Sequence, residues 1–303
     1  MTIVIAGGTG FLGRALTDAL VSEGHDIVLL SRGATNRPRG PRVRVVSWTP
    51  DGSAGAWAGA VDNAHAVVNL AGESIAEGRW NADKKRRILD SRVLATRSLA
   101  AAIGRAATPP PAFVSGSAVG FYGPLGDEIV TEDHPAGSDF LAQVCTEWEA
   151  EARRAATPRT RVALIRTGLV LDKHEGALPR MLLPFRFGAG GPLGSGRQYW
   201  PWIHRNDWVD LVRFVINTAS ASGPINATAP APVTNAEFTK ALGRALHRPA
   251  FMPAPAFALR LALGEMADAL LLSGQRAIPA RAEKLGYAFA FRQVDDALRA
   301  AVA

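Results

Sequence analysis

The chain has 303 residues but a single cysteine, Cys145. One thiol excludes an internal disulfide and a zinc site built from cysteines alone, and we expect no metal. No apolar run reaches the roughly 18–20 residues that a membrane-spanning helix needs. The opening "MTIVIAGGTG" has no basic leader before its apolar stretch, and no small-residue cleavage site follows it. We interpret it as a strand rather than a signal peptide, and we expect a cytoplasmic protein without a membrane partner.

Acidic residues are fewer than basic ones, 27 against 34, which gives a formal net charge of +7. The basic residues are scattered, and the densest run, "KKRR" at 84–87, lies in a segment with helical periodicity. This pattern favours an arginine pocket for the phosphate groups of a small molecule over a nucleic-acid surface. The arginine-rich segment 84–99 is also a candidate contact between two copies in a homodimer.

Short apolar runs recur through the first 172 residues, namely "IVIAG", "DIVLLS", "AVVNLAG", "PAFVSGS" and "VALIRTGLVL". They are rich in Val, Ile and Leu and lack polar alternation, as is typical of parallel strands that are buried on both faces. Segments with helical periodicity separate them at 11–24, 83–106 and 139–155. The alternation predicts an α/β fold with a doubly wound parallel sheet.

The pattern changes after residue 172. Residues 188–204, "GAGGPLGSGRQYWPWIH", are interpreted as a loop, and helices are predicted over 205–219 and 234–246, the second capped by Thr234 or Asn235. We expect a nucleotide-binding domain that comprises 1–170 and 204–228. A smaller substrate-side domain would comprise 171–203 and 229–303.

A glycine-rich turn, "IVIAGGTGFLG", joins the first strand to the first helix. A tight turn with close backbone approach needs glycine, and the helix N-terminus offers free N–H groups and a positive dipole end to a pyrophosphate. The spacing predicts a dinucleotide site, with a glycine turn that holds no ligand as the alternative. The predicted contacts are Gly7, Thr9, Gly10, Phe11, Leu12 and Gly13.

The end of the second strand selects the cofactor. "DIVLL" is followed by Ser31 and Arg32, where an NAD site usually has an acidic side chain. A guanidinium pairs with a 2′-phosphate and stacks on adenine, so we predict NADP(H), against the alternative of a solvated arginine. The strand end within "VVNLAG" is predicted to line the ribose, or else to be an ordinary buried strand end, through Leu70, Ala71 and Gly72.

The motifs "GGTGFLG", "NLAG", "SGSAVGFYG" and "PWIHRNDWVD" together resemble the extended short-chain dehydrogenase/reductase superfamily. "GRWNADKKRRILDSR", "GGPLGSGRQYWPWIH", "APVTNAEFTKAL" and "LLLSGQRAIPARAEKLGY" are similar to its atypical epimerase-family branch, which carries a DUF1731-like C-terminal domain. The resemblance implies a Rossmann domain, NADP(H), and a cleft between the two domains. It also implies cofactor contacts at Arg92, Ser115, Gly168 and Val170, although Arg92 has a helix-surface salt bridge as its alternative.

The superfamily's catalytic serine is matched by Ser117, but its Tyr-x-x-x-Lys pair has no counterpart in the sequence. The three tyrosines, Tyr122, Tyr199 and Tyr287, are followed four residues later by Gly126, Ile203 and Phe291. On the helix predicted over 139–155, the register puts Leu141 and Cys145 in those two places. A leucine cannot move a proton, so another group is needed for acid–base chemistry.

Several residues are candidate substitutes, each with a structural alternative. Tyr122 is either a proton donor to a carbonyl or a wall of the pocket. Cys145 is either an acid or nucleophile or a small buried hydrophobe. His204 either contacts substrate or makes a structural hydrogen bond, and the loop with Tyr199 and Trp200 is either a lid over the substrate or an aromatic cluster at the domain junction.

These patterns predict an NADP(H)-dependent oxidoreductase that acts on a small carbonyl or alcohol, with Ser117 polarising the reacting oxygen and Tyr122 or water delivering the proton. Two alternatives stay open. One is a catalytically impaired protein that senses NADPH and passes the signal to a partner. The other is a nucleotide-sugar epimerase.

Overall fold

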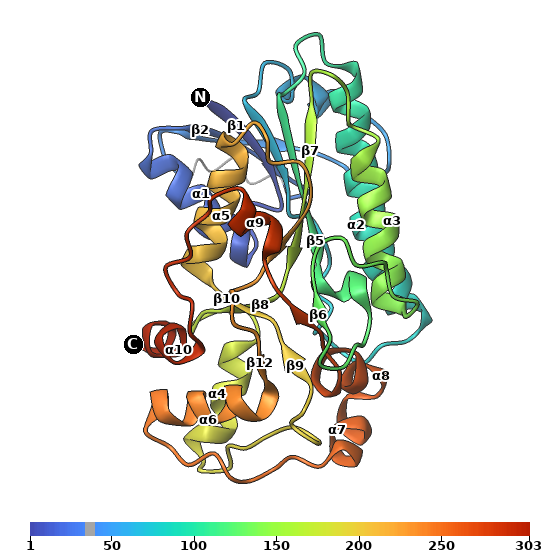
Figure 1. Cartoon of the computed structure of the whole chain (residues 1–303). Helices are drawn as coiled ribbons and strands as arrows, with labels where there is room; N and C mark the ends of the chain where they lie inside the picture. The colour runs from blue at the N-terminus through green and yellow to red at the C-terminus, as the bar shows by residue number, and fades with distance from the viewer. Residues whose placement is uncertain (34–39) are drawn as a thin grey trace.

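The computed structural model describes residues 1–33 and 40–303. The described residues form a central sheet of seven parallel strands in the order β11-β7-β5-β4-β1-β2-β3 (Figure 1). The strands are β1 (Thr2–Ala6), β2 (Asp26–Ser31), β3 (Val43–Ser47), β4 (Ala66–Asn69), β5 (Ala112–Ala118), β7 (Arg161–Thr167) and β11 (Gly223–Ala227). The predicted α/β doubly wound sheet is confirmed. Its order reverses between β1 and β4, where such sheets open a ligand crevice at their carboxyl edge.

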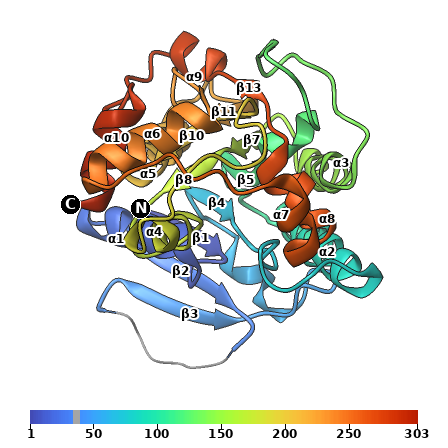
Figure 2. The same cartoon turned by 90° about the horizontal axis from the view of Figure 1, so that it is seen from below.

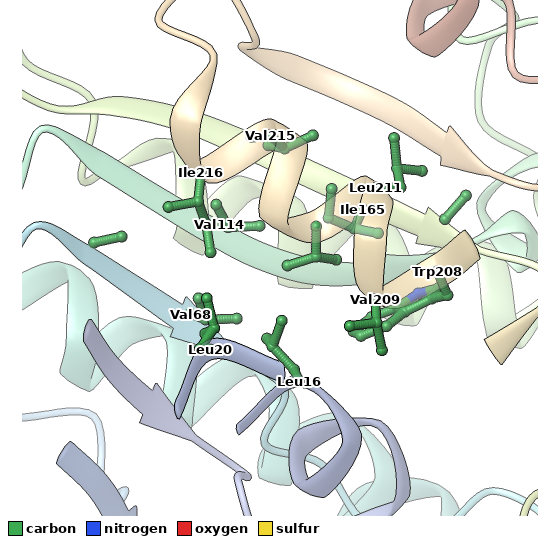
Figure 3. Close-up of a cluster of buried hydrophobic side chains, with 14 of the residues drawn as sticks. Leu16, Leu20, Val68, Val114, Ile165, Trp208, Val209, Leu211, Val215 and Ile216 are labelled. Carbon is green, nitrogen blue, oxygen red and sulfur yellow. The ribbon is translucent and has the colours of Figure 1, made fainter. Parts of the chain in front are cut away.

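Helices cover both faces of the sheet. Helices α1 (Phe11–Ser22) and α5 (Arg205–Asn217) lie on one face, and α2 (Ala82–Arg105) and α3 (Phe140–Arg153) lie on the other (Figures 1 and 2). Figure 3 shows Leu16 and Leu20 of α1 and Trp208 of α5 among the buried side chains of the first face. Since these helices and strands have no exposed apolar side, the carboxyl edge is the natural place for a ligand.

Two strands of the central sheet were not predicted from the sequence. They are β3 and β11, which form its two edges. The predicted run 162–171 divides at Gly168 into β7 and β8 (Leu169–Leu171). The loop prediction for 188–204 is wrong at its end, because β9 (Tyr199–Trp200) and β10 (Trp202–His204) form there. Strand β10 pairs with β8, and β9 pairs with β12 (Val233–Thr234). These short pairs carry the chain from the sheet to the layer below it.

A separate apolar core lies below the carboxyl edge in Figure 1. It forms between α4 (Leu178–Arg186), α6 (Asn235–Leu246) and α10 (Val294–Val302), around Trp200, Trp202 and Phe238. Thr234 caps α6 through a reciprocal capping box with Glu237, as the sequence predicted for one of two residues.

The remaining elements connect these layers. A 3₁₀ turn spans Ala56–Ala60, and another (Val119–Tyr122) follows β5. Near the lower end lie α7 (Ala256–Leu263), α8 (Glu265–Ala267) and a π-helical turn (Asp268–Leu272). The chain then returns upward through β13 (Arg276–Ala277), which pairs with β6 (Ile129–Val130), and α9 (Ala280–Lys284). Within residues 1–33 and 40–303, no helix has the length and apolar character to cross a bilayer.

Candidate functional site

The turn between β1 and α1 lies directly against the end of β4. Gly7 has φ +79°, and a Cβ atom built there would lie 2.5 Å from the carbonyl carbon of Leu70. A Cβ atom at Gly13 would lie 2.2 Å from the carbonyl oxygen of Gly7. Real Cβ atoms do not approach backbone this closely, so both positions require glycine. The turn is therefore as tight as a backbone cradle for a pyrophosphate needs to be.

Helix α1 presents its N-terminus at this turn. Gly10 is the N-cap and provides no side-chain cap, so the first N–H groups of the helix, at Phe11 to Gly13, have no intrahelical acceptor. Thr9 and Gly10 are exposed beside them. Arg14, one turn along, donates to the carbonyl of Thr9 at 2.6 Å and pairs with Glu175. An anionic group at this end would meet both free N–H groups and the positive end of the helix dipole.

The end of β2 lies beside the glycine turn, because Leu30 pairs with Ala6. Ser31 ends the strand, and its hydroxyl donates to the carbonyl of Gly33 at 3.3 Å. Arg32 follows as an exposed side chain at the carboxyl edge. Ser31 and Arg32 thus lie at the carboxyl edge of the sheet beside the glycine turn.

Asn69, at the end of β4, is a buried residue that sequence reasoning did not single out. Its amide nitrogen donates to Thr96 at 2.8 Å, and its oxygen accepts the N–H of Ala71 at 3.2 Å. These bonds fix the turn that carries Leu70, Ala71 and Gly72. The signal was visible in the sequence, since an asparagine inside an apolar strand run needs buried partners.

Arg92 lies against Gly72, where a Cβ atom would be 3.1 Å from the guanidinium carbon. Its Nη1 donates to the carbonyls of Glu73 and Ile88, both at 3.0 Å, and its guanidinium lies 5.3 Å from the ring centroid of Trp148. Burial lowers the pKa of Arg92 from its ordinary value, and Cys145 and Glu73 oppose that shift. Arg92 is therefore a fixed, half-buried cation near the end of β4, held by backbone carbonyls rather than by a helix-surface salt bridge among the described residues.

The other predicted cofactor contacts lie on neighbouring strand ends. Ser115 of β5 is buried, with its hydroxyl 3.3 Å from the carbonyl of Gly116. Val170 is largely buried on β8. At Gly168 a Cβ atom would lie 2.3 Å from the carbonyl oxygen of Pro201, so only glycine fits between β7 and the 201 turn. Ser115 and Gly168 thus lie at or near the ends of β5 and β7, whereas Val170 lies on β8 outside the central sheet, and the surroundings of Ser115 and Val170 shield both.

Ser117, near the end of β5, joins a buried ion pair. Its hydroxyl donates to Oε1 of Glu149 at 2.7 Å. Arg166 of β7 donates to both oxygens of Glu149, at 2.8 and 3.0 Å, and neither residue is more than 2% exposed. The guanidinium carbon of Arg166 also lies 3.5 Å from the ring centroid of Phe121. A two-point pair of this geometry fixes the carboxylate, and with it the direction of the Ser117 hydroxyl.

The chain matches two family models over most of its length. Residues 3–227 match the NAD dependent epimerase/dehydratase family, and residues 254–301 match DUF1731, a domain of unknown function. The chain belongs to the NAD dependent epimerase/dehydratase family. The resemblance inferred from the motifs is therefore confirmed, for both the cofactor domain and the C-terminal domain.

Three similar proteins define the neighbourhood within the family. The chain is 43% identical to an epimerase family protein, ML0860, of Mycobacterium leprae, over 98% of this chain and 94% of that protein. The crystal structure of human epimerase family protein SDR39U1 with NADPH superposes with a TM-score of 0.90, at 38% identity and with 99% and 98% of the two chains covered. The nucleoside-diphosphate sugar epimerase of Corynebacterium glutamicum superposes with a TM-score of 0.78 at 36% identity, over 98% of this chain and 57% of that one.

Against this family background, the position of Tyr122 is informative. Its hydroxyl donates to Asn226 at 2.7 Å and accepts from Arg166 at 3.0 Å, and the residue is 1% exposed. Burial raises the pKa of Tyr122 to about 12, and the neighbouring Arg166 opposes the shift. A phenol that is buried and bonded on both sides favours the pocket-wall interpretation over proton delivery.

Cys145 lies on the inner side of α3 next to Ser117 and is 4% exposed. Burial raises the pKa of its thiol to about 12, with Glu149 adding to the shift. Thiolate chemistry at neutral pH is therefore disfavoured, and the geometry favours the buried-hydrophobe interpretation. Leu141, one turn before it, lies near Gly120 in the turn after β5.

The candidate substrate residues lie in structural positions. His204 is the N-cap of α5, where its Nδ1 accepts the N–H of Asn206 at 3.2 Å. Its ring is 4.1 Å from that of Phe291, and burial lowers its pKa to about 4. Trp200 is buried edge-on against Phe238, and Arg276 lies 5.1 Å from the ring of Tyr199. These contacts favour the structural alternative for His204 and for Trp200.

Asp207, in the first turn of α5, holds the C-terminal segment. Its two carboxylate oxygens accept the N–H groups of Ala290 and Phe291 at 2.8 and 2.9 Å. No cluster of three or more His, Cys, Asp or Glu side chains suited to a metal ion occurs in the part of the chain that the structure describes. The site therefore consists of the glycine cradle, the strand ends beside it, and the buried Ser117 network.

Proposed function

We propose that this protein binds NADP(H) across the carboxyl edge of the sheet and transfers hydride between the nicotinamide and a small carbonyl or alcohol substrate. The observation that supports cofactor binding is the glycine turn itself, in which the positions of Gly7 and Gly13 leave no room for a side chain. The human relative crystallised with NADPH supports the same choice at 38% identity. The nicotinamide supplies or accepts the hydride when it is bound, and the chain's own residues orient the reactants.

Arg32 is proposed to recognise the 2′-phosphate. It follows Ser31 directly at the end of β2 and is exposed at the edge that faces the cradle. A guanidinium there offers several N–H donors to a phosphate, whereas an NAD site would present a carboxylate to the ribose hydroxyls. We expect Arg32→Ser to weaken NADPH binding and to leave NADH binding unchanged.

Ser117 is proposed to bind the reacting oxygen as an acceptor. Its single hydroxyl proton is donated to Glu149, so the serine oxygen can only accept further hydrogen bonds through its lone pairs. A substrate alcohol can donate to those lone pairs, whereas a carbonyl oxygen cannot unless the Ser117–Glu149 bond is exchanged. The arrangement therefore favours the alcohol form of the substrate in the ground state, with Glu149 as the acceptor of the serine proton.

The test combines cofactor titration with a substrate screen. NADPH and NADH affinities are measured for the wild type and Arg32→Ser, and panels of small alcohols with NADP⁺ and carbonyls with NADPH are then screened for turnover. Ser117→Ala is expected to reduce turnover about a hundredfold or more, the usual contribution of a positioned catalytic group. Ser53→Ala, which removes an exposed hydroxyl that donates to Asp51, serves as the matched control. Equal affinity of the wild type for the two cofactors would refute the cofactor assignment.

A second candidate function is an NADPH-responsive binding protein. One observation favours it: burial holds the pKa values of Tyr122 and Cys145 near 12, so neither group is suited to release a proton at neutral pH. NADPH binding with no turnover in the screen would support this function. Nucleotide-sugar epimerisation, as the Corynebacterium glutamicum relative's name indicates for that protein, requires hydride removal and return, and a UDP-sugar panel in the same screen tests it.

A further inference from the structure

Exposed hydrophobic side chains gather at one end of the molecule. Of the eight large hydrophobic residues that are exposed in the described chain, six come from α4 and the residue after it, from the segment after α6, and from α7. These elements form the lower end in Figure 1, away from the central sheet. The six residues are Leu183, Phe187, Phe251, Met252, Phe257 and Leu261.

The segments that carry these side chains are tied to one another. The N–H of Met252 donates to the carbonyl of Gly190 at 3.0 Å, and that of Ala254 donates to Pro192 at 2.9 Å, so 252–254 runs alongside the segment that follows Phe187. Helix α7 begins two residues later, with the sequence AFALRLAL, and none of its residues is buried. A helix whose apolar side chains stay exposed gains little free energy from burying them in its own chain.

The two segments that carry these exposed apolar side chains are basic, although Glu265 and Asp268 follow α7. Segments 176–198 and 238–264 contain no aspartate or glutamate. Arg244 pairs with Asp295, and Arg260 pairs with Asp268. The charges of these two arginines are therefore neutralised by carboxylates that lie outside the two segments. An open depression of about 700 Å³ at the end of α6 is lined by Lys240, Arg244, His247, Arg248 and Phe251, among others. The other basic residues of the two segments are Arg180, Arg186 and Arg197.

We propose that this end, the basic apolar surface, docks on an anionic lipid surface. Exposed phenylalanine and leucine side chains enter the boundary between headgroups and acyl chains, while arginine and lysine keep their charges at the level of anionic headgroups. A second copy of the chain would bring like charge against like charge, which disfavours self-association through this surface. The proposal replaces the expectation that the protein has no membrane partner, and it does not depend on the proposed function.

The test is sedimentation of the full chain with vesicles. Vesicles of phosphatidylcholine alone are compared with vesicles of phosphatidylcholine and phosphatidylglycerol in equal amounts, at low and high salt. We expect binding to the anionic vesicles only, weakened by salt. The double variants Phe251→Ser/Phe257→Ser and Arg186→Gln/Arg248→Gln should each lower the partition coefficient about tenfold or more, one through lost apolar insertion and the other through lost charge.

Matched controls separate this surface from the general positive charge of the protein. Ile129→Ser removes an apolar side chain that is 54% exposed elsewhere on the protein, and Arg105→Gln removes an exposed charge at the end of α2. Both should bind vesicles as the wild type does, and NADPH affinity measured on every variant reports whether the fold is intact. Absence of binding to anionic vesicles overturns the proposal. Binding that the arginine variant loses but the phenylalanine variant keeps also overturns it, since that pattern shows electrostatic attraction to the headgroups without insertion of the apolar side chains.

Discussion

The hydroxyl of Ser117 on β5 donates to the carboxylate of Glu149 on α3 at 2.7 Å, and Arg166 on the neighbouring strand β7 donates to the same carboxylate. The orientation of the candidate catalytic serine is thus set by an ion pair that is completely buried. The pair is a positioning device, because the side chains of both Glu149 and Arg166 are buried. Its integrity should be measurable both in stability and in cofactor-dependent turnover.

Glu149→Gln should destabilise the protein by about 3–5 kcal/mol, because it leaves the Arg166 charge buried without its counter-charge. The free energy of unfolding in urea measures the loss. Glu147→Gln, two residues along the same helix and partly exposed, should change stability by less than about 0.5 kcal/mol. In the double variant Glu149→Gln/Arg166→Met the loss should be smaller than the sum of the two single losses. Additive losses would contradict a direct pairing.

Gly13→Ala should abolish NADPH binding or prevent folding, because its Cβ would lie 2.2 Å from the carbonyl oxygen of Gly7. The same substitution at Gly104, near the end of α2, is the control. Among the described residues no atom lies within 4 Å of a Cβ there, and alanine in a helix is up to about 1 kcal/mol more favourable than glycine. Calorimetric titration with NADPH and thermal unfolding measure both variants. Normal cofactor affinity in Gly13→Ala would refute the cradle.

His204→Asn should flatten the loss of stability in acid. The folded pKa of His204 is lowered to about 4 from 6.5, so the unfolded chain takes up a proton first as the pH falls. The stabilisation is present above pH 6.5 and is lost between 6.5 and about 4, by about 3 kcal/mol. Asparagine keeps an N-cap acceptor without titrating. Burial also lowers the pKa values of His25 and His65, so part of the slope should persist in the variant. Urea unfolding across this pH range compares the two proteins, and identical slopes would contradict the assignment.

Tyr122→Phe should cost about 1–3 kcal/mol of stability, because it leaves the oxygen of Asn226 without its donor in a buried site. NADPH affinity should stay unchanged, since the hydroxyl faces the network and not the cradle. Once a substrate is found, turnover should fall little at any pH. Unchanged stability with a loss of turnover of a hundredfold or more would assign Tyr122 the proton-donor role instead.

The glycine turn could be predicted from the sequence because its constraint is local. Gly7 and Gly13 restrict the backbone itself, and the strand before and the helix after them follow in order. The same holds for the Thr234 cap, which depends on four consecutive residues. The edge strands β3 and β11 were missed because an edge strand lacks the continuous apolar run of a central one: Arg44 is exposed, and the run at β11 starts with glycine and proline.

The Ser117 network could not be predicted, because its members come from four separate parts of the chain. Glu149, Arg166 and Asn226 each fit an ordinary helix or strand pattern by themselves, and only the packing of α3 on β5 and β7 makes them partners. Glu149 is fully buried, and its charge is paired with Arg166 and Arg153. Position in the sequence could identify Ser117, but not the acceptor of its proton.

The return of the chain to the sheet after residue 275 has a consequence for shortened versions of this protein. Glu132 accepts the N–H groups of both Asn226 and Arg281, and Asp207 accepts those of Ala290 and Phe291. A version cut before this segment would deprive the buried carboxylate of Asp207 of both of these donors and that of Glu132 of one of its two, and it would uncover one side of the nucleotide half. The final thirty or so residues thus stabilise the nucleotide-binding half, and we do not expect that half to fold stably as a separately expressed fragment.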